Sequence, residues 1–428
     1  MNQEALAAIA IFVLIFGLIS RRLEQSIVTP PMAYVLFGLL ISSSALGLIQ
    51  EVEVTNELIK VLAEITLAIL LFTDASRIKL KQLRREYNLP LRLLSIGLPI
   101  TIILGTVLAV LLFPDLGLWE AAVLSTMLAP TDAALGQAIV NSSGIPASIR
   151  QAINIESGLN DGICLPILLM FFSLAEESAQ TGAAYWFKFA SQQVIFGTLI
   201  GIAIGYAGIE AIALSLRQDW ITNSFEDLAV LGLSILAYTC AEIIGGNGFI
   251  AAFVAGLVVG IVGTKSNLER LQEFAEAEGQ LLTLISFLLF GAVMVIPSLD
   301  RASWQIWVYA LSSLTLVRII GVAIAFSGLK LQLDSTLIVG WFGPRGIASI
   351  IYGLLVIEKE DLPGGELIFT TMVITVLISI FAHGITAYPG SIWYGNRIKS
   401  KKHLHDRMPE MNPVPELPVR LPWRRSQN

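Results

Sequence analysis

The chain has 428 residues, of which 55% are hydrophobic and only 14% are charged, and its mean hydropathy is +0.74. An average soluble protein is about 25% charged, so this chain carries far more apolar surface than one soluble core can bury. The composition therefore excludes a soluble globular protein and indicates an all-α polytopic membrane protein. The formal net charge of -6 says little about partners, because the charges lie in loops on both sides of a bilayer. We expect no nucleic-acid partner.

Cysteine and histidine usage gives no sign of a disulfide framework or of a resident metal. Cys164 and Cys240 lie in apolar stretches without CxxC spacing, and the three histidines are too scattered for a metal cluster. We therefore expect no cofactor.

Apolar segments long enough to cross a hydrocarbon core, which needs roughly 20 helical residues, recur along the whole chain. The first segment has no basic residue before it and is followed by Arg21 and Arg22, so we interpret it as a retained span rather than a cleaved signal peptide. We expect about thirteen transmembrane helices. Their approximate limits are 5–20, 31–49, 57–73, 90–113, 119–140, 150–174, 187–214, 225–244, 249–263, 280–297, 303–327, 335–357 and 366–388.

The basic residues indicate the orientation, because Lys and Arg in short loops stay on the cytoplasmic side of the membrane. They follow the odd-numbered segments, at Arg21, Arg22, Arg77, Lys79, Lys81, Arg84, Arg85, Arg150, Arg217, Lys265, Arg270, Lys330 and from Arg397 to Lys402. The opposite loops are acidic, at Glu51, Glu53, Glu57, Asp115, Glu176, Glu177, Glu358, Glu360 and Asp361. We therefore expect residues 1–390 to form the transmembrane domain, with the N-terminus outside and the C-terminus in the cytoplasm. Residues 391–428, rich in proline and charge, are expected to form a short, poorly ordered cytoplasmic tail.

Two expected helices carry interruptions at membrane depth. Segment 119–140 contains LAPTDAALG, in which Pro130 removes a backbone donor next to Asp132. Segment 335–357, seven segments later, contains GWFGPRGIAS with Arg345 between glycines and a proline. Paired interruptions at corresponding positions of two halves indicate the site of a transporter built as an inverted repeat. The alternative is a pair of unrelated proline kinks.

The stretch ESGLND, residues 156–161, places ionisable groups on the next expected helix. At 3.6 residues per turn Glu156 and Asn160 share one face, while Ser157 and Asp161 share an adjacent strip. A hydroxyl and a carboxylate are hard oxygen donors suited to an alkali cation, and Asp132 with carbonyls around Thr131 would complete the set.

Glu156 needs a countercharge if it stays ionised at this depth. Arg318, in LTLVRIIG, and Arg345 are the two cations available within the expected spans, and the residues alone leave both open. A cation channel or uniporter would use the same ligands without proton coupling. An intramembrane hydrolase is disfavoured, because the spans contain no GxSxG or HExxH motif.

The combination of TDAALG on an interrupted helix, ESGLNDG on the next, LTLVRIIG and a later GPRG resembles the NhaP-type sodium/proton antiporters of the monovalent cation:proton antiporter superfamily. The resemblance covers about residues 5 to 390. It implies a core domain, including about residues 90–174 and 303–388, whose two crossed, interrupted helices move against a dimerisation domain. It also implies a homodimer in the cell (inner or plasma) membrane.

The same resemblance implies roles for individual residues. Asp161 would bind both the ion and the proton, with Asp132, Ser157 and the Thr131 carbonyl as further ligands of Na+. Asn160 occupies the position where electrogenic relatives carry a second aspartate. The resemblance also favours Arg318 as the partner of Glu156, leaves Arg345 to compensate helix dipoles at the crossing, and makes Asp74 in LFTDASRI a weaker candidate for a supporting acid.

These features predict an electroneutral monovalent cation/proton antiporter that works by alternating access. A proton and Na+ or Li+ would compete for Asp161, and the empty carboxylate would be unable to cross the apolar barrier. Donor type alone does not rank Na+, Li+ and K+.

Overall fold

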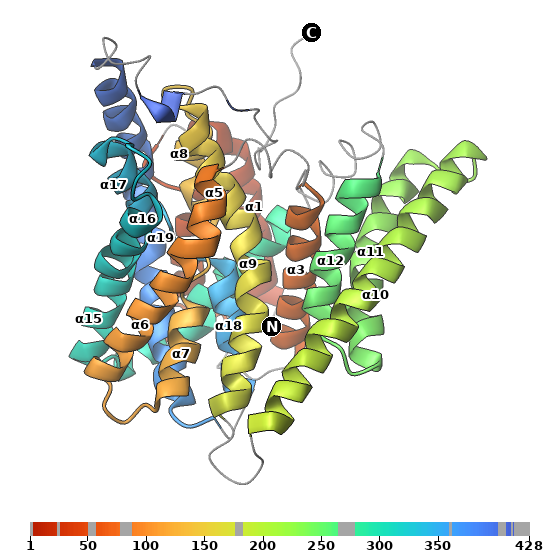
Figure 1. The fold of residues 1–428 in the computed structure, drawn as a ribbon, viewed down its shortest axis with the longest axis horizontal. Helices are drawn as coiled ribbons and strands as arrows, with labels where there is room; N and C mark the ends of the chain where they lie inside the picture. The colour runs from red at the N-terminus through yellow and green to blue at the C-terminus, as the bar shows by residue number, and fades with distance from the viewer. Residues whose placement is uncertain are drawn as a thin grey trace.

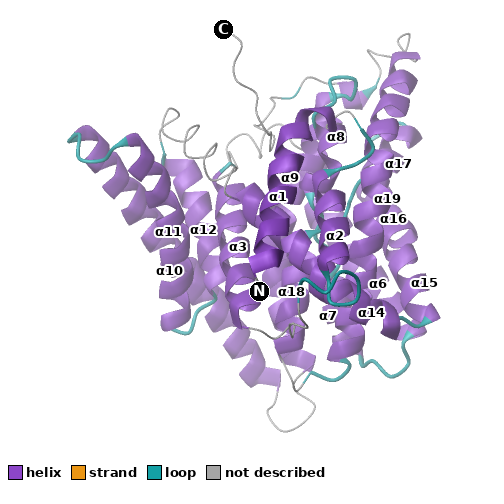
Figure 2. Ribbon diagram, turned by 180° about the vertical axis from the view of Figure 1, so that it is seen from behind, coloured by secondary structure: helices purple, strands orange, loops and turns teal. Residues whose placement is uncertain are grey.

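The computed structural model describes residues 3–23, 26–49, 57–77, 88–175, 183–263, 279–358, 362–400, 408–411 and 414. All regular elements within these ranges are helical, as Figure 2 shows. Seven of the helices are long and apolar enough to cross a membrane, namely Gln3–Ser20, Asn88–Leu112, Ala147–Ala175, Ser191–Arg217, Gly279–Arg301, Trp304–Ala325 and Gly365–Ser400.

The first helices are α1 (Gln3–Leu23), α2 (Pro30–Ile41) and α3 (Glu57–Ser76). Proline begins α2, where its missing N–H costs no helical hydrogen bond. Helix α2 packs against the π-helical turn η4 (Phe290–Met294) through Gly38 and Gly291, where a Cβ on either residue would meet the backbone of the other helix. The turn η4 continues into α14 (Val295–Arg301).

Two helices of similar construction pack against each other. One comprises α5 (Asn88–Arg92), the π turn η1 (Leu93–Gly97) and α6 (Leu98–Leu112). The other comprises α15 (Trp304–Ser312), the π turn η5 (Ser313–Val317) and α16 (Arg318–Ala325). They meet closely at Gly97 and Gly321. Single π turns inside α-helices are frequent at functional sites.

Both sequence-predicted interruptions are present. Helix α7 (Leu118–Met127) ends before an irregular stretch, 128–132, which leads into the 3-10 turn η2 (Ala133–Gly136) and α8 (Gln137–Val140). Helices α17 (Leu333–Trp341) and α18 (Ile347–Glu358) are likewise separated by residues 342–346, and Asp132 in the first break bonds Pro344 in the second. Whether the two form an inverted repeat stays a prediction.

The remaining helices are α9 (Ala147–Ala175), α10 (Ala183–Arg217), α11 (Asn223–Ile243), α12 (Gly248–Val262) and α19 (Gly365–Ser400). Helices α3, α10, α11 and α12 form one side of the molecule, and the helices of both interruptions lie on the other (Figures 1 and 2). Helix α9 lies between them and contacts α3, α7, α10 and α12. The ESGLND stretch on α9 is therefore at the seam between the two sides.

Each predicted segment falls on a helix, or on an interrupted pair, within the described residues, but segment 31–49 is helical only as far as Ile41. The exact number of thirteen crossings and the orientation stay predictions. Many residues used for the orientation lie outside the described residues, namely Glu51, Glu53, Lys79, Lys81, Arg84, Arg85, Glu176, Glu177, Lys265, Arg270, Glu360, Asp361, Lys401 and Lys402.

The tail differs from the expectation of poor order in the part that the structure describes. Helix α19 continues to Ser400, and residues Pro409–Met411 form the 3-10 turn η7. The reason is packing, because Tyr394 and Ile398 are buried in a cluster with Met408. The composition predicts poor order because charged residues and prolines outnumber the few apolar residues that are buried.

The packing of α10 on α12 gives a test of the fold. A Cβ on Gly201 would lie 2.6 Å from the Ala251 carbonyl oxygen and 2.8 Å from the Val254 Cβ, and Gly197 and Gly205 make similar approaches to α12. Gly201→Leu is expected to destabilise the protein by about 1–3 kcal/mol, which is the usual effect of overpacking, and to lower its melting temperature in detergent. Gly232→Leu is the matched control, because nothing lies within 4 Å of its Cβ position. Equal melting temperatures for the two variants would contradict this packing.

Candidate functional site

Asp132 joins the two interrupted helices. Its N–H donates to the Pro344 carbonyl at 2.7 Å, and its carboxylate Oδ2 accepts the Ile347 N–H at 3.2 Å. Because Ile347 begins α18, the carboxylate lies at a helix N-terminus, where unpaired N–H groups favour negative charge. A Cβ on Gly346 would collide with this carboxylate, so the close approach requires glycine.

Arg345 satisfies carbonyls freed by the break after α7. Its guanidinium Nη1 donates to the Ala129 carbonyl at 3.0 Å and to the Pro130 carbonyl at 3.3 Å. Its backbone N–H donates to the Ser379 hydroxyl at 2.6 Å, and the whole side chain is buried. Ser349 adds a bond from its hydroxyl to the Met127 carbonyl at 2.9 Å. The interrupted backbone is therefore held by protein groups, as membrane depth requires.

Thr131 is the contact between the first break and α9. The Ser157 hydroxyl donates to the Thr131 carbonyl at 2.6 Å, and the Asn160 Nδ2 donates to the Thr131 hydroxyl at 2.7 Å. All three residues are buried. The other side-chain atom of Asn160, Oδ1, is buried without a hydrogen-bond partner among the described residues. Thr131 thus fixes both strips of ESGLND against the break.

Asp161 lies one residue beyond this contact and is partly exposed. Its backbone carbonyl accepts the Tyr352 hydroxyl of α18 at 2.7 Å, so α9 is also bonded to the second interrupted helix. Asp161 follows Asn160 directly, and Asp132 follows Thr131 directly, so the Asn160–Thr131 bond brings the two carboxylate-bearing stretches together.

Glu156 pairs with Arg318 rather than with Arg345. The guanidinium Nη1 and Nη2 of Arg318 donate to Oε1 and Oε2 of Glu156, both at 2.6 Å, and each residue is 1% exposed. Such a two-bond geometry is the strongest arrangement of these groups. Arg318 is the first residue of α16, directly after the π turn η5, and a Cβ on Gly343 would meet its side chain. The ion pair therefore lies against the second break.

Asp74 is buried near the end of α3 and faces α9. A Cβ on Gly158 would lie 4.0 Å from the Asp74 Cβ, which places the residue beside the turn that carries Ser157. The structure thus brings Asp74 to the same seam as the other predicted site residues.

Several contacts of the site were missed by the sequence reading. In an apolar run, the sequence does not distinguish a hydroxyl side chain that only packs from one that bonds the backbone of another helix. This is the case for Tyr352, Ser349 and Ser379. His383 is another such contact, because it is buried within α19 and its Nδ1 is hydrogen-bonded with the Ser379 hydroxyl. The spacing of four between Ser379 and His383 was the available signal.

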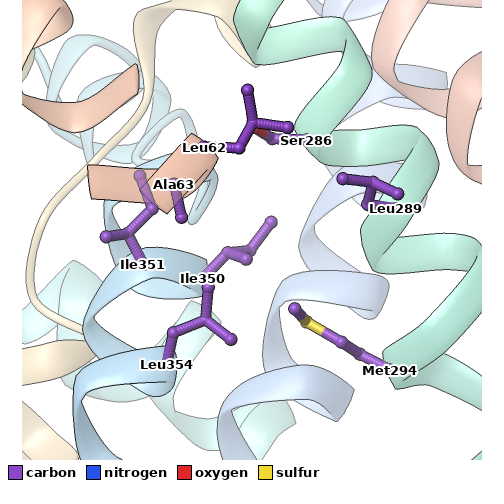
Figure 3. A pocket seen from close by; sticks show the side chains of 8 residues that line it. All are labelled: Leu62, Ala63, Ser286, Leu289, Met294, Ile350, Ile351 and Leu354. Carbon is purple, nitrogen blue, oxygen red and sulfur yellow. The ribbon is translucent and has the colours of Figure 1, made fainter. Parts of the chain in front are cut away.

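Two further features, a possible metal-ion cluster and a pocket, provide no second candidate for an ion site. The described residues contain no group of three or more His, Cys, Asp or Glu side chains placed to hold a metal ion. Figure 3 shows a pocket between α3, the Gly279–Arg301 helix and α18, lined by Leu62, Ala63, Ser286, Leu289, Met294, Ile350, Ile351 and Leu354. Its one polar side chain, Ser286, donates to the Leu282 carbonyl, so the pocket is too apolar for an ion.

Similar proteins are transporters by name. The chain is 24% identical over 397 residues to the K+/H+ antiporter NhaP of Alkalimonas amylolytica, covering 92% of this chain and 66% of the relative. It is 25% identical over 367 residues to the Na+/H+ antiporter ApNhaP of Aphanothece halophytica, covering 82% and 68%. The chain spans about a third to two thirds of the length of the first three curated relatives it matches.

The fold is shared with a solved structure. The sodium proton antiporter MjNhaP1 of Methanocaldococcus jannaschii superposes with a TM-score of 0.76 at 18% identity, covering 92% of this chain and 98% of that one. At this identity the likeness shows the fold, which is that of a helical multi-pass membrane protein. The family model for the transmembrane domain of sodium/hydrogen exchangers matches residues 7–391. The chain therefore belongs to the sodium/hydrogen exchanger family.

Proposed function

We propose that this protein exchanges a monovalent cation for a proton across the membrane, with Asp161 as the carboxylate that both substrates share. The observation that carries the proposal is the Thr131 contact, which holds a broken helix, a hydroxyl and an amide beside Asp161. The similarity to proteins named Na+/H+ and K+/H+ antiporters supports the same reaction class.

The ligands of the cation would be the carboxylates of Asp161 and Asp132, the Ser157 hydroxyl and the Thr131 carbonyl. All are oxygen donors, which hard cations prefer. Asn160 Oδ1, buried and without a hydrogen-bond partner among the described residues, supplies a further oxygen at the same place. Asp74 would act as a supporting acid from α3. The expected cations are Na+ or Li+.

Coupling follows from competition for one carboxylate. A loaded Asp161, neutral as an acid or as an ion pair, can pass an apolar barrier that opposes the bare anion. Asn160 cannot ionise, and Glu156 is held by Arg318. One positive charge therefore replaces one positive charge, and the exchange is electroneutral.

Alternating access would come from movement along the seam at α9. We assign residues 90–174 and 303–388 to a core that moves against the side formed by α3 and α10–α12, which would carry the contact of a homodimer in the plasma membrane. The N-terminus would lie outside and the C-terminus in the cytoplasm.

Asp161→Asn tests the shared carboxylate. The amide keeps the shape but cannot exchange a proton, so cation-dependent proton flux in proteoliposomes is expected to fall to the background of protein-free liposomes. Asp115→Asn, in an exposed loop, is the control for reconstitution. Flux near the wild-type rate in Asp161→Asn would contradict the assignment.

Glu156→Gln tests whether the ion pair is structural. Breaking a buried pair strands an arginine and typically costs about 3–5 kcal/mol, so the melting temperature in detergent should fall clearly. The control is Glu366→Gln, which breaks the exposed pair with Arg301, where about 0–1 kcal/mol is expected. If both variants melt alike, the structural role of the Glu156–Arg318 pair is wrong.

Electroneutral exchange is measured by clamping the membrane potential of proteoliposomes. Proton flux driven by Na+, Li+ or K+ should be the same at zero and at negative potential, because no net charge crosses. A cation current that persists without a proton gradient would instead favour a channel or uniporter, the alternative function. The three cations also give the selectivity.

A further inference from the structure

Helix α18 is hydrogen-bonded to both residues that carry the carboxylates of the candidate site. At its first residue, the Ile347 N–H donates to the Asp132 carboxylate at 3.2 Å. Further along the helix, the Tyr352 hydroxyl donates to the Asp161 backbone carbonyl at 2.7 Å. An α-helix rises about 1.5 Å per residue, so the two positions on α18 lie roughly 7.5 Å apart along its axis. One helix therefore spans the distance between the two acidic residues.

The position of α18 is fixed by its packing and by a third hydrogen bond. Ile351 and Val356 are buried in the main apolar core. The Ser349 hydroxyl, on the same face as Tyr352, donates to the Met127 carbonyl at the end of α7. Close-packed interiors leave few voids into which such a helix could shift. The bonds of α18 therefore determine where the groups that they hold are placed.

The backbone of α9 depends on outside contacts next to Asp161. Pro166 lies inside α9 and has no N–H, so the helical ladder lacks the bond to the Gly162 carbonyl, four residues earlier. Gly162 packs closely against α12, because a Cβ there would collide with the Phe253 ring. The helix is thus weakened one residue after Asp161, and the Tyr352 hydroxyl bonds the backbone at that point.

Packing alone does not require a hydroxyl at position 352. The surrounding run, IASIIYGLLVI, is apolar, and Tyr352 is fully buried. A buried hydroxyl is unfavourable unless it finds a hydrogen-bond partner, and here the partner is the Asp161 carbonyl. Phenylalanine fills nearly the same space, so the difference between tyrosine and phenylalanine at this position is the bond to Asp161.

We propose that Tyr352 is a positioning residue that determines the cation selectivity of the exchanger. The inference rests on the proposed function, in which Asp132 and Asp161 bind the same cation. Selectivity among hard cations depends on the size and flexibility of the set of oxygen ligands. Because α18 holds both acidic residues, the separation of their carboxylates follows the helix rather than the radius of the ion. The site therefore discriminates among Li+, Na+ and K+ by size.

The experiment compares Tyr352→Phe with the wild type, using the full chain in proteoliposomes. The half-saturating concentrations of Li+, Na+ and K+ are measured from cation-driven proton flux. The wild type should discriminate among the three cations. In Tyr352→Phe, the ratio between the least and the most preferred cation should fall about two- to tenfold, which corresponds to the loss of one hydrogen bond. The change should appear in these concentrations rather than in the maximal rate, because Asp161 still exchanges protons.

Tyr394→Phe is the matched control. Tyr394 is also fully buried, and its hydroxyl bonds the Ser335 hydroxyl at 2.8 Å, at the end of α17 away from the crossing. This variant should keep the wild-type selectivity. A shift in Tyr394→Phe as large as that in Tyr352→Phe overturns the proposal. So does an unchanged ratio in Tyr352→Phe, including the case where all three cations lose transport equally, and so does a wild type that does not discriminate.

A binding measurement separates failure of this proposal from failure of the exchange. A ligand that binds the folded protein raises its melting temperature, so Li+, Na+ and K+ are compared by the increase each causes in detergent at alkaline pH, where protons compete least. The three increases should differ clearly in the wild type and less in Tyr352→Phe. Equal differences in the two proteins, or no increase with any cation, overturn the role of Tyr352 whether or not ions are transported. Absence of wild-type flux with all three cations counts against the exchange itself.

Discussion

The structure depends on a requirement of backbone at membrane depth: every carbonyl and N–H that leaves a helix must find another partner. At the crossing of the two interrupted helices, Arg345 takes the carbonyls of Ala129 and Pro130, and Asp132 takes the Ile347 N–H. These partners are ionisable groups because a charge offers a stronger hydrogen bond than a neutral side chain. Providing hydrogen-bond partners for the interrupted backbone therefore places charged side chains at a fixed point inside the fold. The same irregular backbone leaves the Thr131 carbonyl to be bonded by Ser157 from α9, which forms the candidate site.

Charge balance separates the groups that hold the candidate site from Asp161, the group proposed to exchange the proton and the cation. Glu156 and Arg318 neutralise each other in a two-bond pair with almost no exposure. The Asp132 carboxylate accepts the Ile347 N–H at the N-terminus of α18, and the Arg345 guanidinium donates to the Ala129 carbonyl. Asp161 differs from these residues because the residue as a whole is partly exposed, although its Oδ1 is buried, and because its backbone carbonyl accepts the Tyr352 hydroxyl. An exchangeable proton or cation needs such access, which is the physical reason for assigning the cycle to Asp161.

The helices and both interruptions could be predicted from the sequence, because proline and glycine at membrane depth and charge in apolar runs are strong local signals. It also placed Asp132, Ser157, Asn160 and Asp161 on the right elements. It left the partner of Glu156 open from the residues alone, since Arg318 and Arg345 are far from Glu156 in sequence and only tertiary packing decides between them. Tyr352 and Ser379 were missed for the same reason. The order of the tail at Tyr394 and Glu410 was mispredicted, because few apolar anchors were outweighed by charge and proline in the composition.

Helix α17 connects the tail, which its composition predicts to be poorly ordered, to the crossing of the two interrupted helices. Its first turn is capped by Glu410 from the tail, and its last residue is followed by the break whose Pro344 carbonyl accepts from Asp132. A nine-residue helix is short, so its position is set by what binds its two ends rather than by its own stability. Any displacement of α17 along its axis must change the capping contact and the crossing together. The capping contact of Glu410 and the crossing at Asp132 are thus joined through one short helix.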